Sequence, residues 1–144
     1  MPASVRFQMD PRWEVGLLAI GAPAMEQASV IVAAGQKRRM PVSEDGSYGR
    51  AAGYARDRVQ VERGGDTIGP FWDVGSDATT PEGYNYPLGL ELGTRPHTIE
   101  SHGNYPLRNR KTGQIFGRSV QHPGNPPFPW CRSALGDLAG RVFR

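Results

Sequence analysis

Residues 58–74 read RVQVERGGDTIGPFWDV, and this stretch indicates the fold class. Polar and apolar residues alternate over 58–62, which is typical of a half-buried β-strand. The Gly-Gly-Asp cluster at 64–66 predicts a turn, and the apolar residues of 67–74 predict a returning strand. The stretch therefore predicts an antiparallel hairpin. Because Pro70 has no backbone N–H, we expect it at an edge, a bulge or a strand end.

An amphipathic helix is expected on the N-terminal side of this hairpin, over residues 11–39. Asp10 can cap the first free amides, and Pro11 suits the first helical turn. Small and apolar residues then recur at three- and four-residue steps, which marks one face of a helix. Pro23 is expected to kink this helix or split it in two. The basic residues 37–39 suit its C-terminal end.

Three further elements are predicted on the C-terminal side. Residues 88–92 fit either a short helix or a strand, because periodicity cannot decide over so few positions. Residues 97–121 predict a second, long hairpin that projects from the body, with its tip at 111–113. Residues 130–143 carry apolar side chains at helical spacing and predict a C-terminal helix.

These elements predict an α+β fold, in which an antiparallel or mixed sheet packs against the long N-terminal helix and the C-terminal helix. A chain of 144 residues suits one domain with a single core. The expected regions of this domain, residues 1–144, are an N-terminal arm (1–10), a helical region (11–39), a β-rich region (57–121) and the C-terminal helix (130–143).

Composition excludes several classes of protein. The net charge of +3 is mild, and the basic blocks at 37–39 and 108–111 are too short for a sequence-specific DNA reader. A weak electrostatic contact with nucleic acid stays open. One cysteine excludes an internal disulfide and disfavours structural zinc. No signal-peptide core or bilayer-spanning segment is seen, so we expect a soluble protein from a reducing compartment.

No residue pattern predicts catalysis or a cofactor. Cys131 and His122 could form a nucleophile and its base, but nothing in their spacing provides contact or an orienting third group. Cys131 lies on the apolar face of the last predicted helix, which favours packing. For Glu91 and Asp73, the favoured role is to accept backbone amides or pair with an arginine. The three histidines lack metal-ligand spacing, and no glycine motif for phosphate is present.

The residues alone therefore favour a non-enzymatic assembly module, whose aromatic side chains serve the core or a protein interface. Two alternatives of other classes stay open. One is a small thiol hydrolase that uses Cys131 and His122. The other is an accessory protein that binds DNA through its phosphates.

Three motifs in order add a resemblance. They are MPVSEDG at 40–46; VGS at 74–76 with YPLGLELGT at 86–94; and VQHPG at 120–124 with PFPWCRSAL at 127–135. The set resembles the tail-component or neck family (head–tail joining and tail completion) of long-tailed phages, the siphoviruses. Members of that family read aPvdtG, then vGs…YA…EfGT, then V.HPG…PFLrpAL. The resemblance covers about residues 11–143.

The resemblance implies a structural virion protein of the head–tail connector, assembled in the host cytoplasm. It implies a homo-oligomeric ring, a hexamer, that joins the portal-bound connector to the tail tube. The implied partners are a head-closure (stopper) or adaptor protein, and a tail terminator or tail tube protein. Non-specific contact with channel DNA is also expected, and no membrane is. The alternative within this class is a tail terminator that caps the tube.

Three segments are expected to make the contacts of such a ring. They are the hairpin from 93 to 124, the loop from 75 to 86, and the proline-rich strap from 126 to 130. The strap should hold the last helix against the sheet, with Phe128 and Trp130 as its anchors. The interface residues predicted in these segments are aromatic or carry nitrogen-containing, mostly basic side chains: Tyr84, Tyr86, Arg95, His97, Arg108, Arg110, Phe116, Arg118, Phe128 and Trp130.

Overall fold

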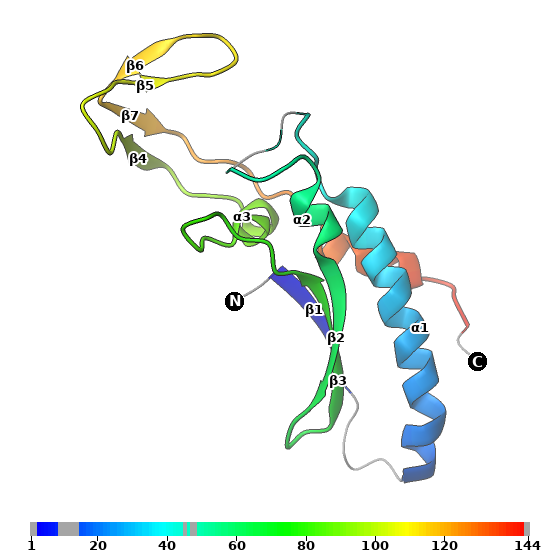
Figure 1. Ribbon diagram of the computed structural model, residues 1–144. Coiled ribbons are helices and arrows are strands. Elements are labelled where there is room, and N and C mark those ends of the chain that lie inside the picture. The colour runs from blue at the N-terminus through cyan, green and yellow to red at the C-terminus, as the bar shows by residue number, and fades with distance from the viewer. Residues whose placement is uncertain (1–2, 9–14, 45, 47–48, 143–144) are drawn as a thin grey trace.

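The computed structural model describes residues 3–8, 15–44, 46 and 49–142, with the backbone alone at 15–20. It is an α+β fold in which a three-stranded sheet lies against a long helix and a slender arm stands away from both (Figure 1). The elements are β1 (Ala3–Gln8), α1 (Val15–Arg39), α2 (Tyr54–Asp57), β2 (Val59–Gly65), β3 (Pro70–Ser76), α3 (Tyr86–Leu92), β4 (His97–Glu100), β5 (Leu107–Arg108), β6 (Ile115–Gly117), β7 (Ser119–His122) and the 3-10 helix η1 (Arg132–Leu138).

The predicted hairpin is present as β2 and β3, and β3 is the central strand of the order β1-β3-β2. Its turn lies at 66–69 and not at 64–66 as expected. The Asp66 carboxylate accepts hydrogen bonds from the N–H groups of Ile68 (2.8 Å) and Gly69 (3.2 Å), which stabilises the later turn. Pro70 is the first residue of β3, so its expected place at a strand end is confirmed.

The expected N-terminal arm is wrong over residues 3–8, which form the edge strand β1. All six residues pair with β3, from Ala3 opposite Ser76 to Gln8 opposite Phe71. Gly75 permits this pairing, because a Cβ atom there would lie 2.1 Å from the carbonyl oxygen of Ala3. The terminal segment thus completes the sheet.

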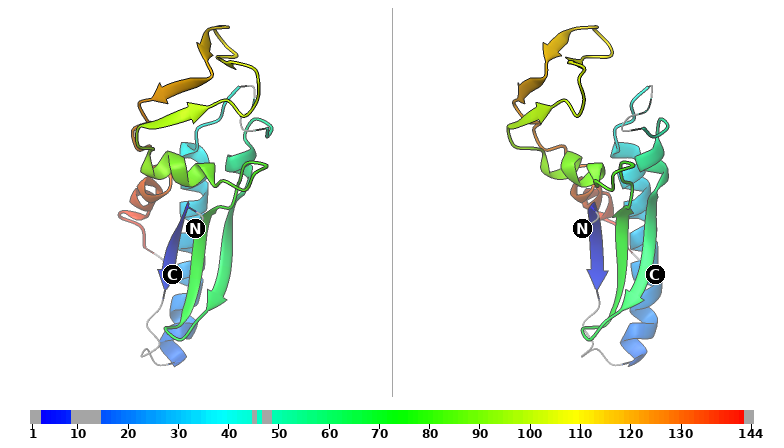
Figure 2. Two further views of the ribbon diagram at one scale, coloured as in Figure 1. Left: turned by 90° about the vertical axis from the view of Figure 1, so that its left-hand side faces the viewer. Right: turned by 60° about the vertical axis from the view of Figure 1, so that its left-hand side comes forward.

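The long helix α1 is continuous from Val15 to Arg39, so of the two expected effects of Pro23, a kink or a split, the split is wrong. The predicted start at Asp10 and Pro11 lies outside the described residues. Pro23 is on the exposed side of α1. Its missing N–H removes one hydrogen bond of the helix, and the packing of α1 along the sheet holds the helix together across that position (Figure 2).

The core lies between α1 and the sheet and continues under α3 and η1. Val32 of α1, Val74 of β3 and Ala134 of η1 form one buried cluster. A second cluster joins segments that are far apart in the chain: Ala3, Met40, Ala55, Val59, Ala78, Tyr86, Trp130 and Cys131. No helix among the described residues is long and apolar enough to cross a membrane.

The C-terminal element differs from the predicted helix over 130–143. It is a 3-10 helix that ends at Leu138, and Val142 beyond it is 81% exposed. Gly140 explains the early end, because its φ of 73° lies in the left-handed region and cannot continue the helix. The expected contact with the body holds for Cys131 and Ala134, which are buried.

Residues 88–92, which fitted a helix or a strand, are helical in α3. Asn85 caps this helix by accepting a hydrogen bond from the N–H of Leu88, and Pro87 suits the first turn. The helix lies at the joint between body and arm (Figure 1).

Candidate functional site

The candidate site is the segment from residue 93 to residue 129, here named the arm. It leaves the body after α3, carries β4 to β7, and returns just before Trp130 (Figure 1). The structure describes every residue of the arm, and none of them is buried. The body, in contrast, encloses large side chains such as Trp130 and Val74 completely. The arm therefore has no core of its own.

The base of the arm is a narrow two-chain joint. Thr94 and Asn125 exchange two backbone hydrogen bonds, with N···O distances of 3.0 and 3.1 Å. Gly124 next to this bridge has a φ of 83°, and a Cβ atom there would lie 2.2 Å from the carbonyl oxygen of Thr94. The two chains can approach this closely only with glycine at that position.

The expected long hairpin is not one continuous ladder. Strand β4 pairs with β7, and β5 pairs with β6, as two short antiparallel ladders. Between β4 and β5 the chain turns, and the Ser101 hydroxyl donates to the carbonyl oxygen of Tyr105 (2.5 Å). The turn at 109–114 includes the predicted tip, and Asn109 Oδ1 accepts from the N–H of Lys111 (2.9 Å).

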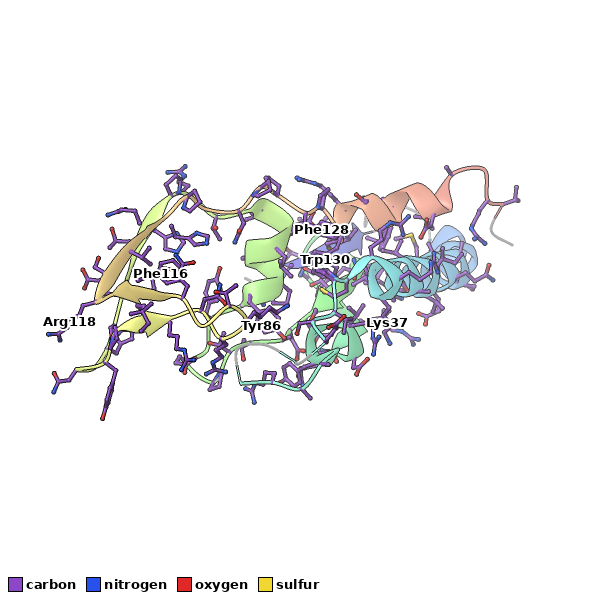
Figure 3. The ribbon with its side chains drawn as sticks, turned by 90° about the horizontal axis from the view of Figure 1, so that it is seen from above. Lys37, Tyr86, Phe116, Arg118, Phe128 and Trp130 are labelled. Carbon is purple, nitrogen blue, oxygen red and sulfur yellow. The ribbon has the colours of Figure 1, made fainter. Side chains whose placement is uncertain are left out.

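Apolar side chains of the arm line an open hollow of about 410 Å³ between its two ladders. They are those of Ile99, Leu107, Phe116 and Val120. Figure 3 shows Phe116 on the arm, well away from the body. Ile115 beside it is 64% exposed. Phe116 and Ile115 are exposed, and Ile99, Leu107 and Val120 are half-buried. Apolar side chains that gather in this way on a segment without a core are typical of a protein interface.

A second hollow, of about 660 Å³, lies where the arm leaves the body. Its lining brings together three residues that the sequence predicted for the interface, Tyr84, Arg95 and His97. Tyr84 comes from the loop before α3 and is 53% exposed. Tyr84 belongs to the predicted contact loop, residues 75–86. Earlier in this loop, Ala78 and Thr80 are buried in the body and are not accessible to a partner.

Most predicted interface residues lie on the exposed arm. The exposed ones are Arg95, His97, Arg108, Arg110, Phe116, Arg118 and Phe128. The prediction of an interface role is wrong for Tyr86 and Trp130. Their side chains are only 7% and 0% exposed and belong to the core of the body. Sequence alone could not separate these cases, since an aromatic residue beside prolines suits both a core and an interface.

The strap from 126 to 130 is held at one end only. The Trp130 indole N–H donates to the carbonyl oxygen of Pro87 (2.9 Å), so Trp130 anchors the strap on α3 as predicted. The expected second anchor, Phe128, is 49% exposed. Its backbone N–H donates to the carbonyl oxygen of Leu90 at 2.7 Å, which holds the chain but not the ring. The ring of Phe128 is therefore accessible to a partner.

Glu91 has the predicted structural role. It is 7% exposed, and its carboxylate accepts from the backbone N–H groups of Cys131 (2.8 Å) and Arg132 (3.3 Å). Asp73 is likewise confirmed in an ion pair, with Arg6 at 2.6 Å. The sequence did not reveal Gln36, whose buried side chain donates to the carbonyl oxygen of Val74 (3.0 Å). Its helical position alone indicates no such bond.

Cys131 and His122 do not form a pair. Cys131 is buried and receives a hydrogen bond from Gln36 Nε2 at 3.2 Å. His122 lies on the arm, where its Nδ1 accepts from the N–H of Gly124 (3.0 Å) and its ring stands 5.1 Å from that of His97. The packing interpretation of Cys131 is confirmed. Among the described residues, no group of three or more His, Cys, Asp or Glu side chains could hold a metal ion.

The thiol of Cys131 is expected to resist modification in the folded protein. Burial, with a smaller effect of the Glu91 carboxylate, raises its pKa to about 12. At pH 8 the thiol is then almost entirely protonated, and the protonated form is not the nucleophile. We expect a chromogenic disulfide reagent to react slowly with the native protein and completely within minutes in guanidinium. Rapid reaction of the native protein would contradict this burial and favour the thiol-enzyme alternative.

Comparison with known proteins returned no match to any family model, curated protein or solved structure.

Proposed function

We propose that this protein is a structural component of a phage head–tail connector, where it forms a ring between the portal-bound connector and the tail tube. One observation carries the proposal: the arm extends from a well-packed body, has no buried residue, and exposes apolar side chains. Such a segment gains stability when a partner covers it. An assembly protein is therefore a better fit than a chain that acts alone.

The body offers a second, different surface to receive an arm. An open hollow of about 340 Å³ lies between α1 and β2, with Val30, Ala33 and Val61 in its lining. Val30 is 54% exposed. Contact between two different surfaces of one subunit is heterologous, and it closes into a ring when the rotation permits. In the proposed ring, the arm of one subunit therefore contacts the body of a neighbour.

The motifs that resemble the phage family support the same proposal. Met40 of the first motif, Tyr86 of the second, and Trp130 and Cys131 of the third lie in one buried cluster. This cluster lies in the body at the joint from which the arm projects. The motifs that this chain shares with the phage family would then build the same joint, and the joint sets the direction of the arm relative to the body.

The proposal is tested in phage lysates that lack this gene. Without the protein, we expect filled heads and separate tails in negative-stain images, and joined virions again after complementation with the wild-type gene. Fully joined virions in the absence of the gene would refute the proposal. Overlong tails would instead indicate the tail-terminator alternative, since a terminator caps the tube.

Complementation with an arm variant tests the proposed interface. The double substitution Ile115→Ser and Phe116→Ser should fail to restore joining. Removing an interface hot spot costs about 2 kcal/mol or more, or roughly 30-fold in affinity. Val142→Ser is the matched control, because Val142 is 81% exposed but lies off the arm. If both variants restored the joining of heads and tails equally well, the arm would not be part of the interface.

A further inference from the structure

The positive charge of this protein is concentrated on the arm. The arm holds five of the 17 Lys and Arg residues but only one of the 14 Asp and Glu residues, Glu100. Its net charge is therefore +4, and the other residues of the chain carry −1. The mild total of +3 hides this division.

The two parts also differ in how their charges are paired. In the body, Arg6 pairs with Asp73 at 2.6 Å, Arg39 with Asp137 at 2.8 Å, and Arg58 with Asp77. Among the described residues, the five arm cations form no ion pair with a carboxylate; they are Arg95, Arg108, Arg110, Lys111 and Arg118. Their charge is left for a partner.

The cations are distributed along the arm and not gathered at one point. Arg95 lies at the base, Arg108 on β5, and Arg110 with Lys111 in the turn at the tip. Arg118 points outward at the far end of the arm (Figure 3). Such a spread matches an extended, repeating anion. Arginine, which provides four of the five charges, binds phosphate through two parallel hydrogen bonds.

We infer that the arm binds the phosphate backbone of duplex DNA without reading its sequence. A two-stranded β-ribbon fits the major groove, and basic side chains on it reach the flanking phosphates. Binding of single strands relies on successive stacked aromatic rings. On β4 to β7 and their connecting turns, the tyrosine and phenylalanine side chains are those of Tyr105, 82% exposed, and Phe116, 39% exposed. The rings of His97 and His122 lie against each other at 5.1 Å, so no row of separate rings is available for successive bases. The inference rests on charge and is independent of the proposed ring.

Fluorescence anisotropy with a labelled 30-base-pair duplex tests this inference. Non-specific binding of this kind has a Kd of about 10⁻⁴ to 10⁻⁶ M at physiological salt, and tighter binding is expected at 50 mM salt. The triple variant Arg108→Gln, Arg110→Gln and Lys111→Gln should bind at least about tenfold more weakly. Its slope of log K against log salt should fall by about 0.9 for each phosphate that the variant no longer neutralises.

A matched triple variant of the body provides the control. Lys37→Gln, Arg56→Gln and Arg141→Gln remove the same total charge from exposed positions off the arm. This variant should keep its affinity within about twofold. Circular dichroism should show both variants folded, because every substituted side chain is exposed. Equal weakening of the two variants would show that net charge alone is responsible and would overturn the inference.

Competitors separate the classes of anionic partner. Unlabelled duplex should displace the probe, and poly-glutamate of equal charge should displace it poorly. Equal displacement by poly-glutamate would overturn the inference in favour of an acidic protein surface. Tighter binding of a single strand of equal length, or no binding of the duplex at 50 mM salt, would also overturn it.

Discussion

Replacement of Trp130 by alanine is expected to lower the free energy of unfolding by about 3–5 kcal/mol. Trp130 is completely buried, and its indole N–H donates to the carbonyl oxygen of Pro87 at 2.9 Å. The substitution leaves a large cavity between the sheet and α3 and leaves that carbonyl without its partner. Both effects act on the same buried cluster, which also contains Tyr86 and Cys131.

Phe128→Ala is the matched control for this prediction. Phe128 lies two residues earlier in the same strap but is 49% exposed, so its truncation should cost less than about 1 kcal/mol. Urea unfolding followed by circular dichroism measures both variants. If the two substitutions cost the same, Trp130 is not the anchor of the strap. In the proposed connector, the order should reverse, with Phe128→Ala weakening assembly in a folded subunit.

Replacement of Glu91 by alanine is expected to cost about 3 kcal/mol in the free energy of unfolding. The carboxylate of this 7% exposed residue accepts from the backbone N–H groups of Cys131 (2.8 Å) and Arg132 (3.3 Å). Each donor that is left without an acceptor costs about 1–3 kcal/mol. The start of η1 would lose its attachment to α3, so the Cys131 thiol should become more reactive.

Two further variants make the Glu91 prediction specific. Glu91→Gln retains one carbonyl oxygen as an acceptor and should cost less than Glu91→Ala. Glu44→Ala, at an exposed position, should change the free energy of unfolding by less than about 0.5 kcal/mol. Urea unfolding and the rate of thiol modification check both. An unchanged thiol rate in a destabilised Glu91→Ala variant would contradict the attachment of η1 by Glu91.

Together these contacts divide the chain into two parts with different roles. The body buries aromatic side chains and pairs many of its charges internally. The arm leaves apolar groups and five cations exposed. Its narrow base at Thr94 and Asn125 is the link between the two parts. Variants of the body should therefore affect stability, and variants of the arm should affect binding.

The amino-acid sequence was sufficient to predict the α+β class, the β2–β3 hairpin, the long first helix, the packing role of Cys131 and the structural role of Glu91. These features depend on local periods, on turn residues and on the chemistry of single side chains, all of which can be seen in the chain. The place of residues 3–8 in the sheet could not be predicted in this way. Their partner strand β3 is far away in the chain, and no local pattern identifies it.

The residues that stay exposed likewise became evident only in three dimensions. Tyr86 and Trp130 were predicted for the interface but fill the core, whereas Phe128 stays exposed. The arginines of body and arm look alike in the sequence, and only their spatial neighbours show which charges are already paired. Burial and charge pairing depend on contacts between segments that are distant in the chain. For that reason, the body and the arm could be told apart only once the chain was folded.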